Sequence, residues 1–258
     1  MKKAIIFLLA FVAIQLVVGY TISGAWMLLE GETPKQNPVL LIATTAATSV
    51  ATIAVFLYLK WVKTSRSYVR SRPWGVLFWC VLAAFGAIVP SMWLQEQMPE
   101  LLNLVEEEFD LILRNRWGYF AIGLLAPLAE EMVFRGAILR QLLASRFSPW
   151  TAIVVSSLFF MLAHFNPAQM PHAFLVGLLL GWMYWRTGSI VPAVAYHWVN
   201  NTIAYVVYNL YPDPDLKLAD VLGSQQHVLM AVGFSLCILL PALFQLNLRM
   251  QKPVESEA

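Results

Sequence analysis

The sequence has few charged residues and few cysteines. Only 12% of its 258 residues are Asp, Glu, Lys or Arg, about half of the roughly 25% found in soluble domains. The net charge of +2 gives no indication of a nucleic-acid partner. Cys80 and Cys237 both lie in apolar runs, so we expect no disulfide framework and interpret both as small hydrophobic residues.

Two common hydrolase patterns are also absent. The chain contains no G-x-S-x-G, the turn that presents a nucleophilic serine. It contains no H-E-x-x-H, the usual zinc-protease helix. Neither cysteine has a sequence neighbour that would activate it. Any hydrolytic chemistry must therefore rest on other side chains.

Long apolar runs separate the charged segments, and this pattern is typical of a multi-pass membrane protein. We predict an all-α fold in one membrane domain over residues 1–258, with about eight transmembrane helices in the lipid bilayer. The first run begins MKKAIIFLLAF and resembles a signal peptide, but its length and the lack of an A-x-A site favour a retained helix. The predicted spans are 4–27, 38–61, 75–95, 117–142, 150–166, 171–186, 190–210 and 227–247.

The connections between these spans alternate in charge. Residues 60–72 carry five basic side chains and no acidic one, whereas residues 96–110 carry six acidic side chains and no basic one. The positive-inside rule then places both termini in the cytoplasm. We expect the protein in the inner (cell) membrane.

Residues 97–116 form a further candidate element between the third and fourth spans. Leu101, Val105, Phe109 and Ile112 recur at helical spacing, with the acidic residues largely on another face. The pattern predicts an amphipathic helix in the outer membrane interface. A solvated loop helix is the alternative.

Glu130 and Glu131 lie inside the fourth predicted span, where a charged residue costs roughly 2.5 kcal/mol or more. Residues four apart share a helix face, so Glu131 is expected to pair with Arg135. Glu130 is turned by about 100° around the helix and has no obvious partner there. An unpaired carboxylate of this kind suits a general base that takes a proton from water. The alternative is that the three charges only hold helices together.

Two histidines lie in other predicted spans. His164 is near the end of the fifth, and His197 is in the seventh with Asn201 four residues later on the same face. Together with Glu130 they suggest a shared polar cavity suited to peptide hydrolysis. Either Glu130 activates water while imidazole and amide groups hold the oxyanion, or His164, His197 and Glu130 bind a divalent metal such as zinc. Spacing alone leaves both routes open.

Three motifs resemble those of the CPBP family of CAAX-protease and bacteriocin-processing membrane proteins. EEMVFR at residues 130–135 matches EExxxR, FMLAH at 160–164 matches FxxxH, and HWVNN at 197–201 contains HxxxN. The motifs occur in order, each on its own predicted span. The resemblance covers residues 117–205, which would form the catalytic core helices.

The resemblance implies an intramembrane endopeptidase, for which we prefer a metal-free route. Glu130 would be the base, and His164 would position water or substrate. His197 and Asn201 would stabilise the oxyanion. Glu131 and Arg135 would support the site.

The expected substrate is a membrane-associated peptide or protein. Eukaryotic members of the family trim prenylated CAAX tails, but the short loops and lysine-led first span here look prokaryotic. Two other function classes stay open. A proton-coupled transporter would also use intramembrane Glu and His, although no inverted repeat is visible. A non-proteolytic scaffold or immunity protein that protects membrane partners is the other.

Overall fold

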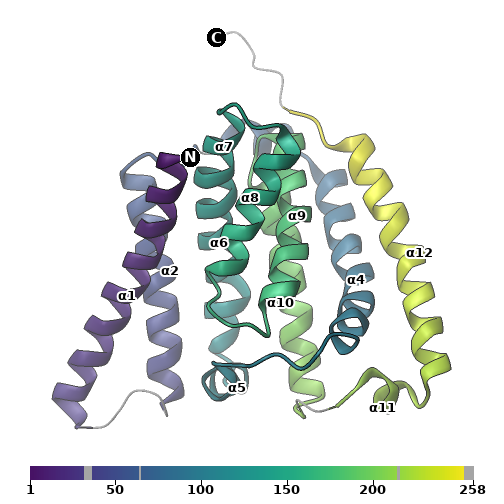
Figure 1. Cartoon of the computed structure of the whole chain (residues 1–258), viewed down its shortest axis with the longest axis horizontal. Helices are drawn as coiled ribbons and strands as arrows, with labels where there is room; N and C mark the ends of the chain where they lie inside the picture. The colour runs from purple at the N-terminus through teal and green to yellow at the C-terminus, as the bar shows by residue number, and fades with distance from the viewer. Residues whose placement is uncertain (32–36, 64, 214–215, 253–258) are drawn as a thin grey trace.

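The computed structural model describes residues 1–31, 37–63, 65–213 and 216–252. It is all helical, with 80% helix and no strand among the described residues, so the predicted fold class is confirmed at this level. The helices form one bundle (Figure 1). Its elements are α1 (Lys2–Glu30), α2 (Pro38–Tyr58), α3 (Arg66–Arg70), α4 (Trp74–Glu96), α5 (Glu106–Leu113), η2 (Tyr119–Leu125), α6 (Ala126–Glu131), η3 (Met132–Leu139), α7 (Arg140–Leu143), α8 (Pro149–Leu162), α9 (Met170–Thr187), α10 (Val191–Leu210), α11 (Leu218–Leu222) and α12 (Gln225–Arg249).

Four helices in the described residues are long and apolar enough to cross a membrane: α1, α2, α4 and α12. They flank the bundle in Figure 1, with α1 and α2 on one side and α4 and α12 on the other. Large apolar side chains on α1 and α12 remain exposed, including Leu28 and Phe234, as expected of helices that face lipid. The other four predicted spans correspond to the more polar or shorter central helices, and their crossing of the membrane stays a prediction.

The fourth predicted span, residues 117–142, is one continuous rod but not a regular α-helix. The π-helical segments η2 and η3 precede and follow the short α6, and α7 completes the rod. The π-helical segments were not predicted from the sequence. Such wide turns occur mostly at functional sites, and here they flank the turn that carries Glu130 and Glu131.

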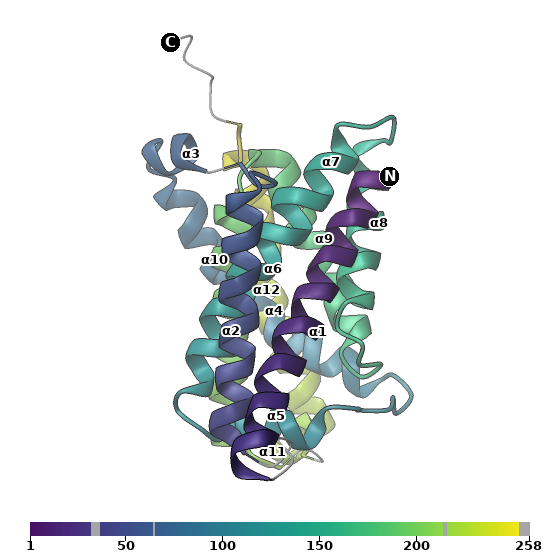
Figure 2. The same cartoon turned by 90° about the vertical axis from the view of Figure 1, so that its left-hand side faces the viewer.

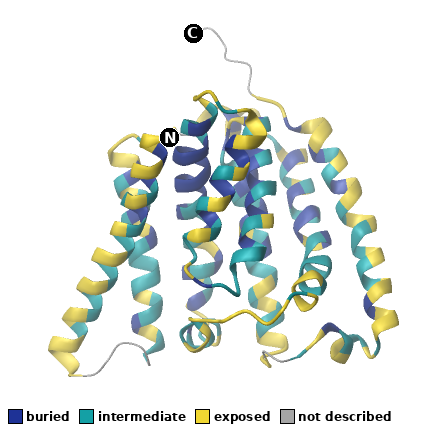
Figure 3. Cartoon of the chain, viewed as in Figure 1, coloured by how far each residue is buried: buried dark blue, intermediate teal, exposed yellow. Residues whose placement is uncertain are grey.

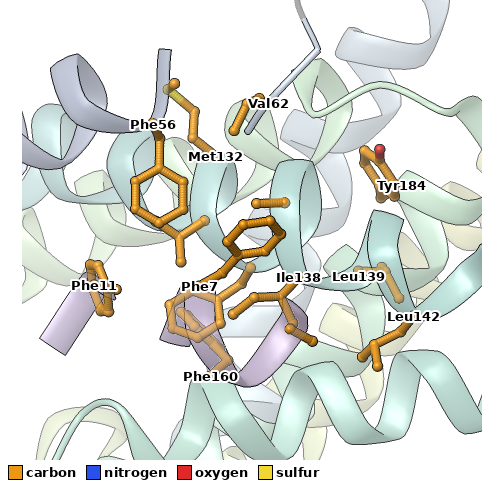
Figure 4. Packing of buried hydrophobic residues seen from close by; sticks show 14 of the residues in the cluster. Phe7, Phe11, Phe56, Val62, Met132, Ile138, Leu139, Leu142, Phe160 and Tyr184 are labelled. Atoms are coloured by element: carbon orange, nitrogen blue, oxygen red, sulfur yellow. The ribbon is translucent and has the colours of Figure 1, made fainter. Parts of the chain in front are cut away.

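The apolar core surrounds η3. Phe134 on η3 lies with its ring centroid 5.4 Å from that of Phe11 on α1 and 5.1 Å from that of Phe160 on α8. Ile138 and Leu139 are completely buried in the same cluster (Figure 4). This packing fixes α1 and α8 against the rod that carries the glutamates.

Glycines on α9 let α8 approach closely. A Cβ atom at Gly177 would lie 3.0 Å from the Ser157 Cβ, and one at Gly181 would lie 2.9 Å from the Ile153 Cγ2. Four-residue spacing of small side chains is a common device for close helix packing in membranes. The contact sets the position of the end of α8, where His164 follows.

The predicted helix over residues 97–116 is much shorter in the structure. Only Glu106–Leu113 is helical, as α5. Residues 97–105 instead run alongside the connection after α8: the Leu104 amide donates to Asn166 Oδ1 at 3.0 Å, and the Ala168 amide donates to the Leu102 carbonyl at 3.2 Å. The interfacial position of this segment stays a prediction.

The two ends of the bundle differ in charge. The first residues of α1, α3, α7 and the last residues of α12 lie at one end, and α5 and α11 lie at the other (Figures 1 and 2). The first, which we call the basic end, carries no acidic side chain among the described residues; its basic residues are Lys2, Lys3, Lys60, Lys63, Arg66, Arg70, Arg72, Arg140, Arg146, Arg186, Arg249 and Lys252. The opposite, acidic end has three basic residues, Arg114, Arg116 and Lys217, and nine acidic ones among those described: Glu30, Glu96, Glu100, Glu106, Glu107, Glu108, Asp110, Asp213 and Asp220.

Candidate active site

Glu131 and Arg135 form a completely buried ion pair. Arg135 Nη1 donates to Glu131 Oε1 at 2.8 Å, and neither side chain is more than 1% exposed. The predicted pairing is therefore confirmed. Two opposite charges one turn apart compensate each other where water is absent, which a single buried charge cannot do.

Arg135 also connects the rod to its two neighbours. Its Nη2 donates to the Gly177 carbonyl on α9 at 3.2 Å. Its guanidinium carbon lies 4.5 Å from the centroid of the Phe160 ring on α8, within the range of a cation–π contact. One arginine thus holds three helices in register beneath the site.

Glu131 has a second partner that the sequence analysis missed. Its Oε1 lies 3.0 Å from Nδ1 of His197 on α10. A carboxylate can only accept, so His197 Nδ1 carries the hydrogen and donates it. This fixes the orientation of the ring and leaves Nε2 on the side of Glu130, whose Oε2 is 3.8 Å away.

The adjacent glutamates therefore have different surroundings. Glu131 is fully buried between Arg135 and His197, whereas the Glu130 side chain is 23% exposed and lines a cavity of about 460 Å³. The cavity is also lined by His164, His197 and Asn201. The structure thus brings all four residues that the sequence singled out for catalysis to one cavity.

The two histidines meet at Phe160. The His164 ring packs edge-on to the Phe160 ring with centroids 4.8 Å apart, and the His197 ring does so at 5.9 Å. His164 Nδ1 is 2.8 Å from the Phe160 carbonyl oxygen. It must donate to this carbonyl, so in a neutral ring His164 Nε2 is the nitrogen with a free lone pair.

Asn201 donates a hydrogen bond to the Ile122 carbonyl, which has no backbone amide partner because residue 127 is proline. In the π-helical register of η2 the Ala126 amide donates to the Ala121 carbonyl, so the amide at position 127 would donate to Ile122. Pro127 has no amide hydrogen. Asn201 Nδ2 donates to the Ile122 carbonyl instead, at 3.1 Å, and its second N–H remains available to the cavity.

The donor atoms at this cavity are not arranged as a metal-ligand cluster. Among the described residues no three His, Cys, Asp or Glu side chains gather in a way that could hold one. His164 and His197 each donate Nδ1–H to a protein oxygen, as metal-bound histidines also do, so these hydrogen bonds do not decide the question. The metal-binding set considered from the sequence, Glu130 with both histidines, lines a common cavity without forming a ligand cluster.

A second cavity of about 560 Å³ adjoins the first, and its wall is mainly apolar. Both cavities share Gln169, His172, Asn200, Ala204 and Tyr208. His172 Nδ1 lies 2.8 Å from Ser91 Oγ on α4. Neither His172 nor Asn200 was predicted from the sequence as a site residue. Asn200 could have been suspected because it directly precedes Asn201, at a variable position of the HxxxN motif. His172 belongs to none of the three motifs.

The helix α5 borders the cavity lined by Glu130 through Phe109 and Leu113. Asp110 on the same helix accepts hydrogen bonds from the Tyr208 hydroxyl on α10 and from Arg114, whose Nε is 2.7 Å away. These bonds, the one from Tyr208 foremost, hold the pKa of the Asp110 carboxyl below its usual value. Asp110 thus connects α5 to the second half of α10.

Comparison with known proteins identifies the central helices. Residues 113–203 match the family model described as "Type II CAAX prenyl endopeptidase Rce1-like", so the chain carries an Rce1-like domain of the CPBP family. The resemblance read from the three motifs is thereby confirmed. The family is made of intramembrane proteases. No curated protein and no solved structure matches this chain.

Proposed function

From the Rce1-like domain at residues 113–203, we propose that this chain is an intramembrane endopeptidase in which Glu130 activates water. The observation that carries the proposal is the cavity itself. Glu130 faces it, and the neighbouring Glu131 is turned away into an ion pair. A partly exposed carboxylate beside two imidazoles and an amide is a suitable base for hydrolysis.

In this proposal Glu130 takes a proton from a water molecule, and the resulting hydroxide attacks the carbonyl carbon of the peptide bond. The carbonyl oxygen becomes negative as the new C–O bond forms. The free N–H of Asn201 and Nε2–H of a protonated His197 donate to it. Glu130 then returns the proton to the amide nitrogen as the C–N bond breaks.

The other residues would prepare the site. Glu131 accepts the Nδ1 hydrogen of His197 and thereby orients the ring, in the way that a buried carboxylate orients a catalytic histidine. Arg135 compensates the charge of Glu131 at 2.8 Å. His164, with its Nδ1 held by Phe160, presents Nε2 to the cavity and would position the attacking water.

We further propose that eight helices cross the membrane, with the basic end in the cytoplasm. The 20 residues of α10 correspond to about 30 Å, enough to span the hydrocarbon. Twelve of the described Lys and Arg residues lie at the basic end and three at the acidic end. The substrate would be a membrane-associated peptide or protein, with apolar residues beside the scissile bond entering the second cavity.

Cleavage of membrane-peptide libraries by the purified protein and by Glu130→Gln tests the proposal. The substitution keeps the size of the side chain but removes the base, so we expect at least about a 100-fold lower rate. Glu107→Gln is the matched control, because Glu107 is exposed on α5 and lines neither cavity. A Glu130→Gln rate equal to wild type would disprove the role of Glu130.

A second arm of the same assay adds a strong chelator. The side chains do not gather around a metal position, so we expect the cleavage rate to stay unchanged. Loss of activity with chelator and its return with zinc would favour the metal-dependent route. A wild-type protein that binds but never cleaves membrane peptides would favour the scaffold function.

A further inference from the structure

The Glu130 cavity extends from the acidic end past the middle of the bundle and stops short of the basic end. On α10 its wall begins at His197 and continues to Tyr208, with no residue before His197. These twelve residues span about 16 Å from the first to the last. On α9 the wall comprises His172, Ala173 and Val176, all in the first two turns after the acidic end.

The remaining walls show the same bias. The rod contributes Ile122, Gly123, Ala126 and Glu130, and none of these lies beyond the middle turn of the rod. From α8 the cavity is lined by Phe160 at its final turn. Helix α5, at the acidic end, supplies the outermost wall (Figure 2). The cavity therefore lies closer to the acidic end than to the basic end, and α5 separates it from the surface at the acidic end.

Toward the basic end the structure is closed. Directly beyond Glu130 lie Glu131 and Arg135, at most 1% exposed. Phe134, Ile138 and Leu142 follow, each with no exposed surface. Figure 3 shows this asymmetry as a concentration of buried residues in the part of the central helices near the basic end. A peptide coming from the basic end would have to pass through a packed core.

The charges of the two ends indicate which side of the membrane each one faces. Membrane proteins keep Lys- and Arg-rich connections in the cytoplasm, whereas acidic residues contribute little to orientation. The connection between α2 and α4 alone contains more basic residues than all described parts of the acidic end together. The acidic end is thereby the one that faces away from the cytoplasm.

We propose that this protease takes its substrate from the extracytoplasmic side of the membrane. The inference rests on the proposed function for the identity of the substrate as a peptide, and on cavity geometry and charge for its side of entry. The substrate class is a secreted peptide, or the segment of a membrane protein exposed at the outer leaflet. A cytoplasmic lipidated tail would face the closed end.

Cysteine labelling tests the orientation without reference to activity. Glu107→Cys on α5 and Ala144→Cys between α7 and α8 are made in a Cys237→Ser background, where the remaining Cys80 is buried. Intact bacterial cells expressing each variant are treated with a membrane-impermeant maleimide. We expect Glu107→Cys to be labelled at once and Ala144→Cys only after permeabilisation. The reverse pattern would overturn the inference.

Vesicle assays test the side of entry directly. The full-length protein is prepared in right-side-out and inverted sealed vesicles, and an impermeant peptide cleaved by the detergent-solubilised protein is added outside. We expect at least tenfold faster cleavage by right-side-out vesicles, with the difference lost in detergent. Faster cleavage by inverted vesicles would refute the proposed side of entry but would still support the proposed protease activity. Failure to cleave any peptide, even in detergent, refutes the proposed function instead, and the labelling result still decides the orientation.

Discussion

Glu131 Oε1 lies 3.0 Å from His197 Nδ1, although the two residues are 66 positions apart in the chain. The same oxygen accepts from Arg135 at 2.8 Å. Glu131 therefore links a buried ion pair to a histidine that lines the same cavity as Glu130. A change in its charge should affect both folding and the proposed chemistry, whereas a residue that served only Arg135 would affect folding alone.

Glu131→Gln is expected to lower both stability and activity. The amide keeps the shape of the side chain but leaves the buried Arg135 charge uncompensated, which should cost about 3–5 kcal/mol of unfolding free energy. His197 Nδ1 also loses the carboxylate that orients its ring at 3.0 Å, so the cleavage rate should fall roughly 10–100-fold. Thermal unfolding in detergent and the peptide assay measure the two effects.

The exposed pair between Asp110 and Arg114 provides the control, since it has the same four-residue spacing. Arg114→Ala should leave the unfolding temperature unchanged, because exposed pairs contribute little. An equal loss of stability in both variants would show that burial is not what matters at Glu131. A normal cleavage rate for correctly folded Glu131→Gln would mean that the Glu131 carboxylate does not act on catalysis through His197.

Pro127→Ala tests how Asn201 is held. Alanine restores an amide hydrogen that can donate to the Ile122 carbonyl, the group to which Asn201 Nδ2 now donates at 3.1 Å. Asn201 then loses its anchor, and we expect kcat to fall about tenfold with KM unchanged. This is less than the 10²–10³-fold loss typical of deleting an oxyanion donor.

Pro192→Ala is the matched control, because Pro192 lies in the first turn of α10, where no helical partner is needed for its amide. It should keep the wild-type kcat. The further substitution Asn201→Ala should slow Pro127→Ala less than it slows the wild type. Equal effects in both backgrounds would mean that Pro127 does not act through Asn201.

Local relationships were readable from the sequence. Glu131 and Arg135 were predicted to pair because residues four apart on a helix must be neighbours, and they do. Glu130 was separated from them by the same geometry. The three motifs on separate spans led to the family that the central residues match.

Relationships between helices were not readable. The contact of Glu131 with His197 depends on how α10 packs against the rod, and no periodicity encodes that packing. The π-helical turns around α6 were missed because they shift side chains without breaking the apolar pattern. The segment 97–116 was expected to be mainly helical, but its first half uses its backbone groups to bind the connection after α8.

Gly177→Ala is expected to separate α8 from α9. The new methyl group would lie 3.0 Å from the Ser157 Cβ, and such overpacking typically costs about 1–3 kcal/mol. Because the Gly177 carbonyl also accepts from Arg135, a shift here should reduce activity together with stability. Gly233→Ala on α12 is the control. Its methyl would meet nothing within 4 Å, so its unfolding temperature should be equal or slightly higher. Equal stability of the two variants would contradict the close packing of α8 on α9.

Ala204→Trp tests whether the second cavity contributes to substrate binding. Ala204 lines both cavities and is exposed to them, so an indole at this position would obstruct the passage between them. For peptides with large apolar residues beside the scissile bond we expect KM to rise at least tenfold, because these residues lose their apolar surroundings. For peptides with alanine at those positions KM should change little. Val206→Trp is the matched control, since Val206 is exposed on α10 but lines neither cavity. If Ala204→Trp slowed both kinds of peptide equally, the second cavity would have no part in selecting the substrate.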